Sequence, residues 1–138
     1  MSSLSIDEVR AEVTRFWNVF TSKASDLLEE FYAPDASVFA SSSARSEPGR
    51  LAVARRKREY FDKQSSVRVQ VGYIEVQLLS DDAAVASYTF QFHANRIAAG
   101  AGNAVEEDIQ HGRATQVFLV DSDHKLRIVH EHFSVSAD

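Results

Sequence analysis

The sequence contains no cysteine. Neither a disulfide framework nor a thiolate metal site can form, and a bound metal would need histidine and carboxylate ligands. This absence fits a reducing cytoplasm, where we expect the protein to reside. The chain begins without a basic segment followed by an apolar run, and it contains no stretch long enough to span a bilayer. We therefore predict a cytoplasmic protein with no membrane partner.

Positive charge is also scarce, since 15 Lys and Arg residues stand against 20 Asp and Glu residues, for a net charge of -5. Binding to a nucleic-acid backbone requires a basic footprint, so we predict no nucleic-acid partner. One local exception is a dense basic cluster between Arg50 and Lys63. We interpret this cluster as a solvated helix face or a contact with an acidic surface.

The length of 138 residues, with 44% hydrophobic and 25% charged residues, is typical of one globular domain. No repeat, linker or low-complexity segment divides the chain. We therefore predict a single domain over residues 1–138.

Three helices are predicted in the first half. Apolar residues at spacings of three and four predict a helix over 6–20, and Ser5 with Glu8 forms a capping box at its start. A short helix is expected near 23–32, before Pro34, and a third begins near Ser46-Glu47-Pro48. The buried faces of the first and third helices are formed by Ile6, Val9, Val13, Phe16, Trp17 and Phe20, and by Leu51, Ala54, Tyr60 and Phe61.

Strands are predicted mainly in the second half. A brief strand at 38–39 precedes a serine-rich loop at 41–45. From residue 67 the apolar period becomes two, and its phase shifts beside Gly72, as a β-bulge would produce. A long strand follows from 84 to about 95, then a mobile loop at 98–103. Two last strands, near 110–120 and 126–135, are joined by a hairpin turn.

Helices followed by strands indicate an α+β fold with the helices on one face of a curved, mostly antiparallel sheet. Several strands carry valine or aromatic residues on both phases. We therefore expect the second face to be covered by another subunit, in a homodimer or a larger homo-oligomer.

Two segments resemble a known family. Residues Gly112–Phe118 and Leu126–Ser134, which end in His130-x-His132-x-Ser134, resemble the closing hairpin of SnoaL-like proteins of the nuclear transport factor 2-like superfamily. Asp81–Tyr88 is similar to a strand of the calcium/calmodulin-dependent protein kinase II association domain. One departure is Leu126, where many relatives have tryptophan. No kinase segment is present.

The resemblance implies a cystatin-like cone with an interior pocket, and oligomerisation through the sheet. It does not specify an activity, because the superfamily includes isomerases, dehydratases, cyclases, epoxide hydrolases and catalytically silent assembly modules.

The histidines of the last strand are the first candidate site. On a regular strand His130 and His132 share a face with Leu126 and Ile128, which suggests a core wall that opens into a polar pocket. A histidine there could transfer protons near neutral pH. Alternatively, both rings are structural and bond to neighbouring backbone or carboxylate groups.

A zinc site is a second possibility for this pair, if His93, His111 or Asp108 supplied a third ligand. The sequence guarantees only two convergent ligands, so we predict no metal and no organic cofactor.

The remaining candidates lie on other elements. Arg113 and Thr115 share one strand phase; an inward arginine would bind a ligand oxygen, whereas an outward one would belong to the subunit interface. A carboxylate base could be Asp108 or Glu106, unless both are solvated. Tyr88 or Tyr32 would be the facing donor. Trp17 is a core residue or a ligand-stacking group.

These features predict a small-molecule-binding protein whose ligand is apolar and oxygenated, with acid-base chemistry of the lyase, isomerase or cyclase type. The alternative is a non-catalytic oligomerisation module.

Overall fold

The structure is a computed structural model that describes residues 3–39, 47–97 and 105–135. The loops predicted at 41–45 and 98–103 lie outside these residues. The elements, in chain order, are α1 (Ile6–Thr21), α2 (Ser25–Glu29), β1 (Tyr32–Phe39), β2 (Glu47–Pro48), α3 (Arg50–Asp62), β3 (Gln64–Val71), β4 (Glu75–Ser80), β5 (Ala83–Ile97), β6 (Val105–Val120) and β7 (Leu126–Val135).

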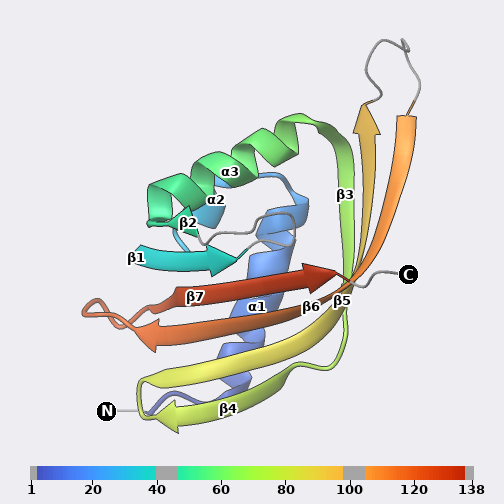
Figure 1. Ribbon diagram of the computed structural model, residues 1–138. Helices are drawn as coiled ribbons and strands as arrows, with labels where there is room; N and C mark the ends of the chain where they lie inside the picture. Colours follow the sequence, from blue (N-terminus) through green and yellow to red (C-terminus); the bar gives the residue numbers. More distant parts are fainter. Residues whose placement is uncertain (1–2, 40–46, 98–104, 136–138) are drawn as a thin grey trace.

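The strands form one curved sheet in the order β2-β1-β7-β6-β5-β3, and β4 also pairs with β5. All the pairings are antiparallel except that of β1 with β7. The long strands β5 and β6 sweep from beside β4 and β7 to beside β3, so the sheet wraps around α1, with α3 above it (Figure 1). The α+β prediction, with helices on one face of a curved and mostly antiparallel sheet, is confirmed.

Helix α1 begins as predicted. The Ser5 hydroxyl accepts a hydrogen bond from the Glu8 amide at 3.1 Å, and the Ser5 amide donates to Glu8 Oε1 at 3.2 Å. This capping box satisfies amide groups that have no partner within the helix. The buried face consists of Val9, Val13, Phe16, Trp17 and Phe20, whereas Ile6 is exposed. Helix α1 therefore directs one aromatic stripe at the sheet.

Two helix boundaries differ from prediction. Helix α2 ends at Glu29, because Tyr32 already belongs to β1. Helix α3 begins at Arg50 rather than near Pro48, which is part of the short strand β2 beside β1. The buried side of α3 includes Val53, and Leu51 is 74% exposed, so its predicted burial was wrong.

The extra residue predicted beside Gly72 is present. Val71 pairs with Phe90 and Glu75 with Ser87, so three residues on one side oppose two on β5. Arg10 of α1 holds this link, since its guanidinium donates to the Ile74 carbonyl at 3.0 Å and to the Tyr73 hydroxyl at 2.6 Å. The sheet bends here, which brings β3 toward the helices.

The core is rich in aromatic side chains. The alternation predicted for β5 is confirmed, because Ala84, Ala86, Tyr88, Phe90 and Phe92 are all buried. They face the aromatic residues of α1; the Trp17 and Phe90 ring centroids, for example, lie 5.4 Å apart. None of the described helices has the length and hydrophobicity that a bilayer crossing requires.

Gly112 lies where β6 passes over the Phe90 ring, and a Cβ atom there would overlap that ring. Phe90 cannot easily move, since it packs on Trp17 and Phe133. We predict that Gly112→Ala lowers the free energy of unfolding by about 1–3 kcal/mol, as overpacked cores do. Urea denaturation would measure the loss.

Gly72→Ala is the matched control. Its Cβ would lie 2.6 Å from the hydroxyl oxygen of Thr89, which is exposed and can rotate away. A Gly112→Ala loss no larger than that of Gly72→Ala would contradict the packing argument.

Candidate functional site

A β-bulge in β7 decides which side chains of this strand face the interior. Phe118 of β6 pairs with Ile128, but Val117 pairs with His130, so Val129 is an extra residue. A one-residue insertion moves the following side chains to the opposite faces of the sheet. Ile128 is therefore buried before the bulge, and Glu131 and Phe133 are buried after it.

The prediction that His130 and His132 point into the pocket was wrong, because the bulge turns both outward. His132 is exposed, and His130 Nδ1 lies 2.7 Å from the Ser37 hydroxyl oxygen of β1. The Phe39 ring contacts both imidazoles, with centroid distances of 6.0 and 5.7 Å. The histidines thus belong to the face of the sheet that lies away from the helices.

Arg113 and Thr115 share this outer face. Thr115 pairs directly with His132, and Arg113 pairs with Ser134. Arg113 is exposed, so of the two orientations that the sequence left open, the structure has the outward one.

The interior position that the histidines were expected to occupy belongs to Glu131, which is 0% exposed. Its carboxylate accepts the Tyr32 hydroxyl at 2.8 and 3.1 Å and the Gln116 amide at 2.7 Å. A buried carboxylate is costly unless it is hydrogen-bonded and paired with a cation. Tyr32, named above as a donor, does face a carboxylate, but that carboxylate is Glu131.

A chain of hydrogen bonds ends on this carboxylate. The Trp17 indole donates to the Tyr88 hydroxyl at 2.8 Å, which donates to the Gln116 side-chain oxygen at 2.7 Å. Burial raises the pKa of Tyr88 and of Tyr32 well above the usual value, and the charge of Glu131 raises both further. Both phenols therefore keep their protons. Tyr88 and Trp17 both lie in the interior, and Trp17 lines the cavity described below, whereas Tyr88 lies outside its lining.

Lys57 of α3 is the cation opposite Glu131, with 3.7 Å between its Nζ and Oε2. Its side chain is only 13% exposed, and Nζ lies 5.4–5.9 Å from the ring centroids of Phe20, Tyr32 and Phe133. Burial lowers the pKa of Lys57, although the charge of Glu131 opposes this shift. An ammonium among aromatic faces next to one carboxylate is thus the electrostatic centre of the interior.

Lys57 also lines a cavity of about 460 Å³ between the helices and the sheet. Aromatic side chains form most of its wall, and charged and polar side chains form its rim. The wall residues are Trp17, Phe20, Tyr60, Phe90, Phe92 and Phe133, and the rim residues include Arg56, Glu59, Lys63, Asp108 and Gln110. Aromatic walls with a few convergent polar groups are typical of small-molecule sites.

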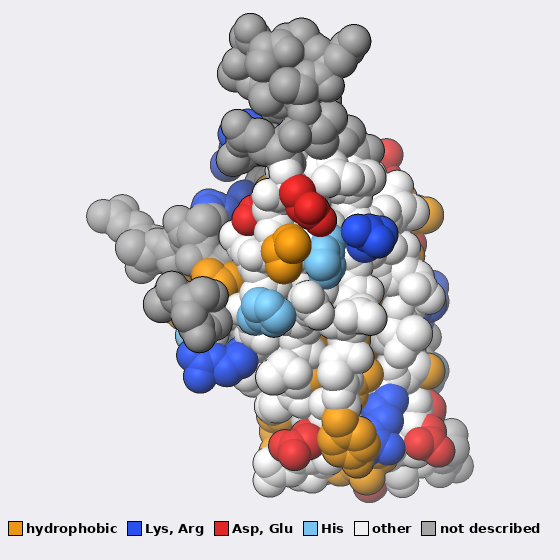
Figure 2. Space-filling view, turned by 90° about the vertical axis from the view of Figure 1, so that its right-hand side faces the viewer, with side chains coloured by type: hydrophobic (Ala, Val, Ile, Leu, Met, Phe, Trp, Pro, Cys, Tyr) orange, Lys and Arg blue, Asp and Glu red, His pale blue; other side chains and the backbone are white. Residues whose placement is uncertain are grey.

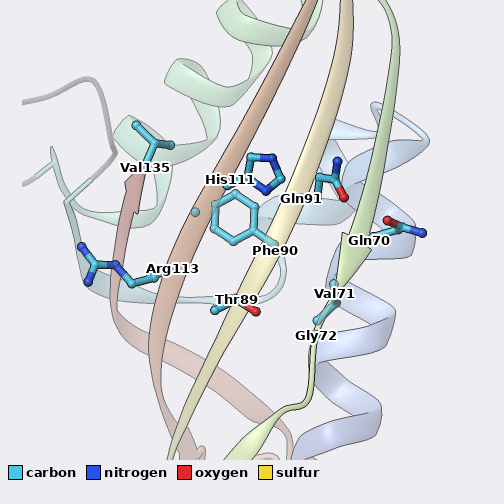
Figure 3. A pocket seen from close by; sticks show the side chains of 10 residues that line it. Gln70, Val71, Gly72, Thr89, Phe90, Gln91, His111, Arg113 and Val135 are labelled. Carbon is cyan, nitrogen blue, oxygen red and sulfur yellow. The ribbon is translucent and has the colours of Figure 1, made fainter. Parts of the chain in front are cut away.

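A larger depression, of about 1100 Å³, lies on the outer face where the sheet bends. Figure 3 shows Thr89, His111 and Arg113 around it on β5 and β6. These three side chains are exposed, and a ligand there would stay in contact with water. The surface on this side carries scattered histidine, charged and hydrophobic side chains (Figure 2). The interior cavity is therefore the better candidate site.

Among the other predicted residues, Asp108 lines the rim of the cavity, half-buried, and accepts a hydrogen bond from Gln110 at 3.3 Å. The side chain of Glu106 lies outside the described part of the chain. Within that part, no three histidine or carboxylate side chains gather as metal ligands would.

Sequence reasoning missed Glu131 and Lys57, although both left a signal. The apolar residues Leu126 and Ile128 occupy even positions, whereas Phe133 and Val135 occupy odd positions, as Glu131 does. This change of alternation indicates a bulge between Ile128 and Glu131. Lys57 lies four residues after Val53 and four before Phe61, on the buried stripe of α3. Lys57 stands among five other basic residues between Arg50 and Lys63, which is a pattern typical of a solvated helix face.

The family model described as the SnoaL-like domain matches residues 9–138, which is nearly the entire chain. The chain belongs to the SnoaL-like family. Among curated proteins, none matches this SnoaL-like chain.

Solved structures share the fold. A proposed calcium/calmodulin-dependent protein kinase II association domain from Xanthomonas campestris superposes with a TM-score of 0.78 at 19% identity, covering 100% of this chain and 96% of that one. A proposed dehydratase of the nuclear transport factor 2-like family from Streptomyces avermitilis gives 0.82 at 15% identity, covering 96% and 97%. A proposed scytalone dehydratase from Novosphingobium aromaticivorans gives 0.81 at 9%, covering 93% and 81%. At these identities the likeness shows the cystatin-like fold, not an activity.

The buried ion pair yields a stability prediction. Glu131→Gln leaves the Lys57 ammonium without its counter-charge, so we expect a loss of about 3–5 kcal/mol in the free energy of unfolding. The double variant Glu131→Gln, Lys57→Met removes both charges and should recover most of this loss. Urea denaturation of the three proteins would measure both effects.

Glu75→Gln, at an exposed position of β4, is the control and should change stability by no more than about 0.5 kcal/mol. If Glu131→Gln behaved like this control, the carboxylate would not have the role assigned to it.

Proposed function

We propose that this SnoaL-like protein binds a small, largely aromatic molecule in the interior cavity, with an oxygen atom of that molecule directed at the Lys57 ammonium. The observation that carries this proposal is the Lys57 ammonium at the wall of an aromatic cavity, on a side chain that is only 13% exposed. An ammonium has three donors, and Glu131 can use only one side of it. The remaining N–H groups are available to a ligand oxygen.

Acid-base chemistry on such a ligand needs a proton donor and a proton acceptor that both face the cavity. Lys57 is the candidate donor, and Asp108 at the rim is the candidate acceptor. Glu131, fully buried behind Lys57, positions the ammonium. Elimination of water from a ligand requires both groups, because one carbon loses a proton and the departing hydroxyl gains one. The two proposed dehydratases among the structural neighbours support a reaction of this lyase type.

Two matched compounds test the role of Lys57 in binding. Benzyl alcohol carries one oxygen, and toluene has the same ring without it. Trp17 is the only tryptophan and lines the cavity, so its indole N–H resonance reports binding of either compound in an NMR titration.

We expect Lys57→Met to reduce the preference for benzyl alcohol over toluene by about tenfold or more, the size of one hydrogen bond from a charged donor. The double variant Lys57→Met, Glu131→Gln should lose the same preference, and it leaves no unpaired charge in the interior. Lys125→Met, in the exposed turn after β6, is the control. An unchanged preference in the Lys57 variants would refute the proposal.

We also propose that the outer face of the sheet pairs with a second copy of the chain. Phe39, Ile109 and Leu119 on this face are 38%, 49% and 42% exposed, which leaves large apolar side chains in water. The likeness to the proposed association domain from Xanthomonas campestris supports assembly through this fold.

This proposal predicts a homodimer or larger assembly at micromolar concentration. Leu119→Glu should shift it toward monomer, because a charge would be buried in the interface. Leu51→Glu, on the opposite side at an even more exposed leucine, should not. Size-exclusion chromatography with light scattering measures the mass of each, and a strictly monomeric wild type would exclude the interface.

A further inference from the structure

Lys57 is placed differently from every other lysine of the chain. Lys63, at the rim of the same cavity, and Lys125 are exposed, and Lys23 donates to the Gln64 carbonyl at 2.6 Å. The Lys57 amine instead lies at a cavity wall, with three aromatic rings around it and a carboxylate at 3.7 Å. Its side chain is only 13% exposed.

This environment suits an amine that acts as a nucleophile. Only the neutral amine has a free electron pair, and desolvation disfavours the ammonium form. Burial lowers the pKa of Lys57 accordingly. The proton that the ammonium releases passes to solvent through the cavity that Lys57 lines, and Glu131 remains beside the nitrogen.

We propose that Lys57 forms an imine with an aldehyde or ketone that enters the cavity. This inference rests on the proposed function, and it narrows the ligand class from oxygenated molecules to carbonyl compounds. The aromatic walls would hold the ring or chain of the carbonyl compound, while the carbonyl carbon faces the amine.

The step needs no oxidant, reductant or cofactor. The nitrogen electron pair attacks the carbonyl carbon, and the electrons of the C=O π bond move to oxygen, which takes up a proton. The hydroxyl then leaves as water while nitrogen forms the C=N bond. In total, the two amine hydrogens and the carbonyl oxygen depart as one water molecule.

The surroundings also favour the product. A protonated imine is a cation at the position of the original ammonium, so Glu131 and the faces of Phe20, Tyr32 and Phe133 stabilise it in the same way. Glu131 acts here as a positioning residue, held by Tyr32 and Gln116.

Reductive trapping tests this proposal. The intact protein is incubated with benzaldehyde and sodium cyanoborohydride at neutral pH, and peptide mass spectrometry locates the benzylated lysines. We expect Lys57 to be labelled about tenfold faster than Lys125, as for activated lysines. Excess benzyl alcohol should slow labelling at Lys57 and leave Lys125 unaffected.

Two variants sharpen the result. Lys57→Arg keeps the positive charge but cannot form the imine, so it should lose the fast label while it still binds benzyl alcohol. Lys125→Arg should keep the fast label. Labelling of Lys57 at the rate of the exposed lysines would overturn the inference.

The failures of the two proposals are distinguishable. If benzyl alcohol shifts the Trp17 resonance and Lys57 is not labelled, the imine is excluded and the binding function stands. If neither ligand has an effect in the cavity, both proposals fall.

Discussion

The buried carboxylate of Glu131 imposes the central constraint on this structure. It must be satisfied away from water, and its partners come from different elements: Tyr32 from β1, Gln116 from β6 and Lys57 from α3. The ion pair therefore lies where the parallel strands β1 and β7 and the helix α3 come together. A buried pair gains little net stability over apolar packing of similar volume, whereas removal of one partner alone is costly.

The aromatic core and the polar network depend on each other. The Lys57 ammonium lies over the rings of Phe20 and Phe133, whose negative faces attract it. Trp17 belongs to both, since its ring lines the cavity and its indole N–H begins the donor chain toward Glu131. A ligand that touches Trp17 is thus connected to the ion pair through Tyr88 and Gln116.

Much of the fold could be predicted from the sequence, because local signals agreed with the tertiary structure. The capping box of Ser5 is a local motif. The apolar stripe of α1 and the alternation of β5 each follow one unbroken period. The site could not be predicted in the same way. His130 and His132 were placed inside by assuming a regular strand, and the extra residue Val129 reverses that assignment. Lys57 appeared to be one of several solvated cations, since its burial depends on Glu131, which is 74 positions later in the chain.

The bulge at Val129 also bears on how this family diverges. In an ordinary strand, a change of pocket chemistry requires a substitution at an inward position. Here, a strand β7 of the same length and sequence that paired without the bulge would place His130 and His132 inside the cone and Glu131 outside it. Relatives that share the His-x-His-x-Ser ending can therefore present different interiors, and an alignment that ignores the bulge would pair functional groups that never occupy the same place.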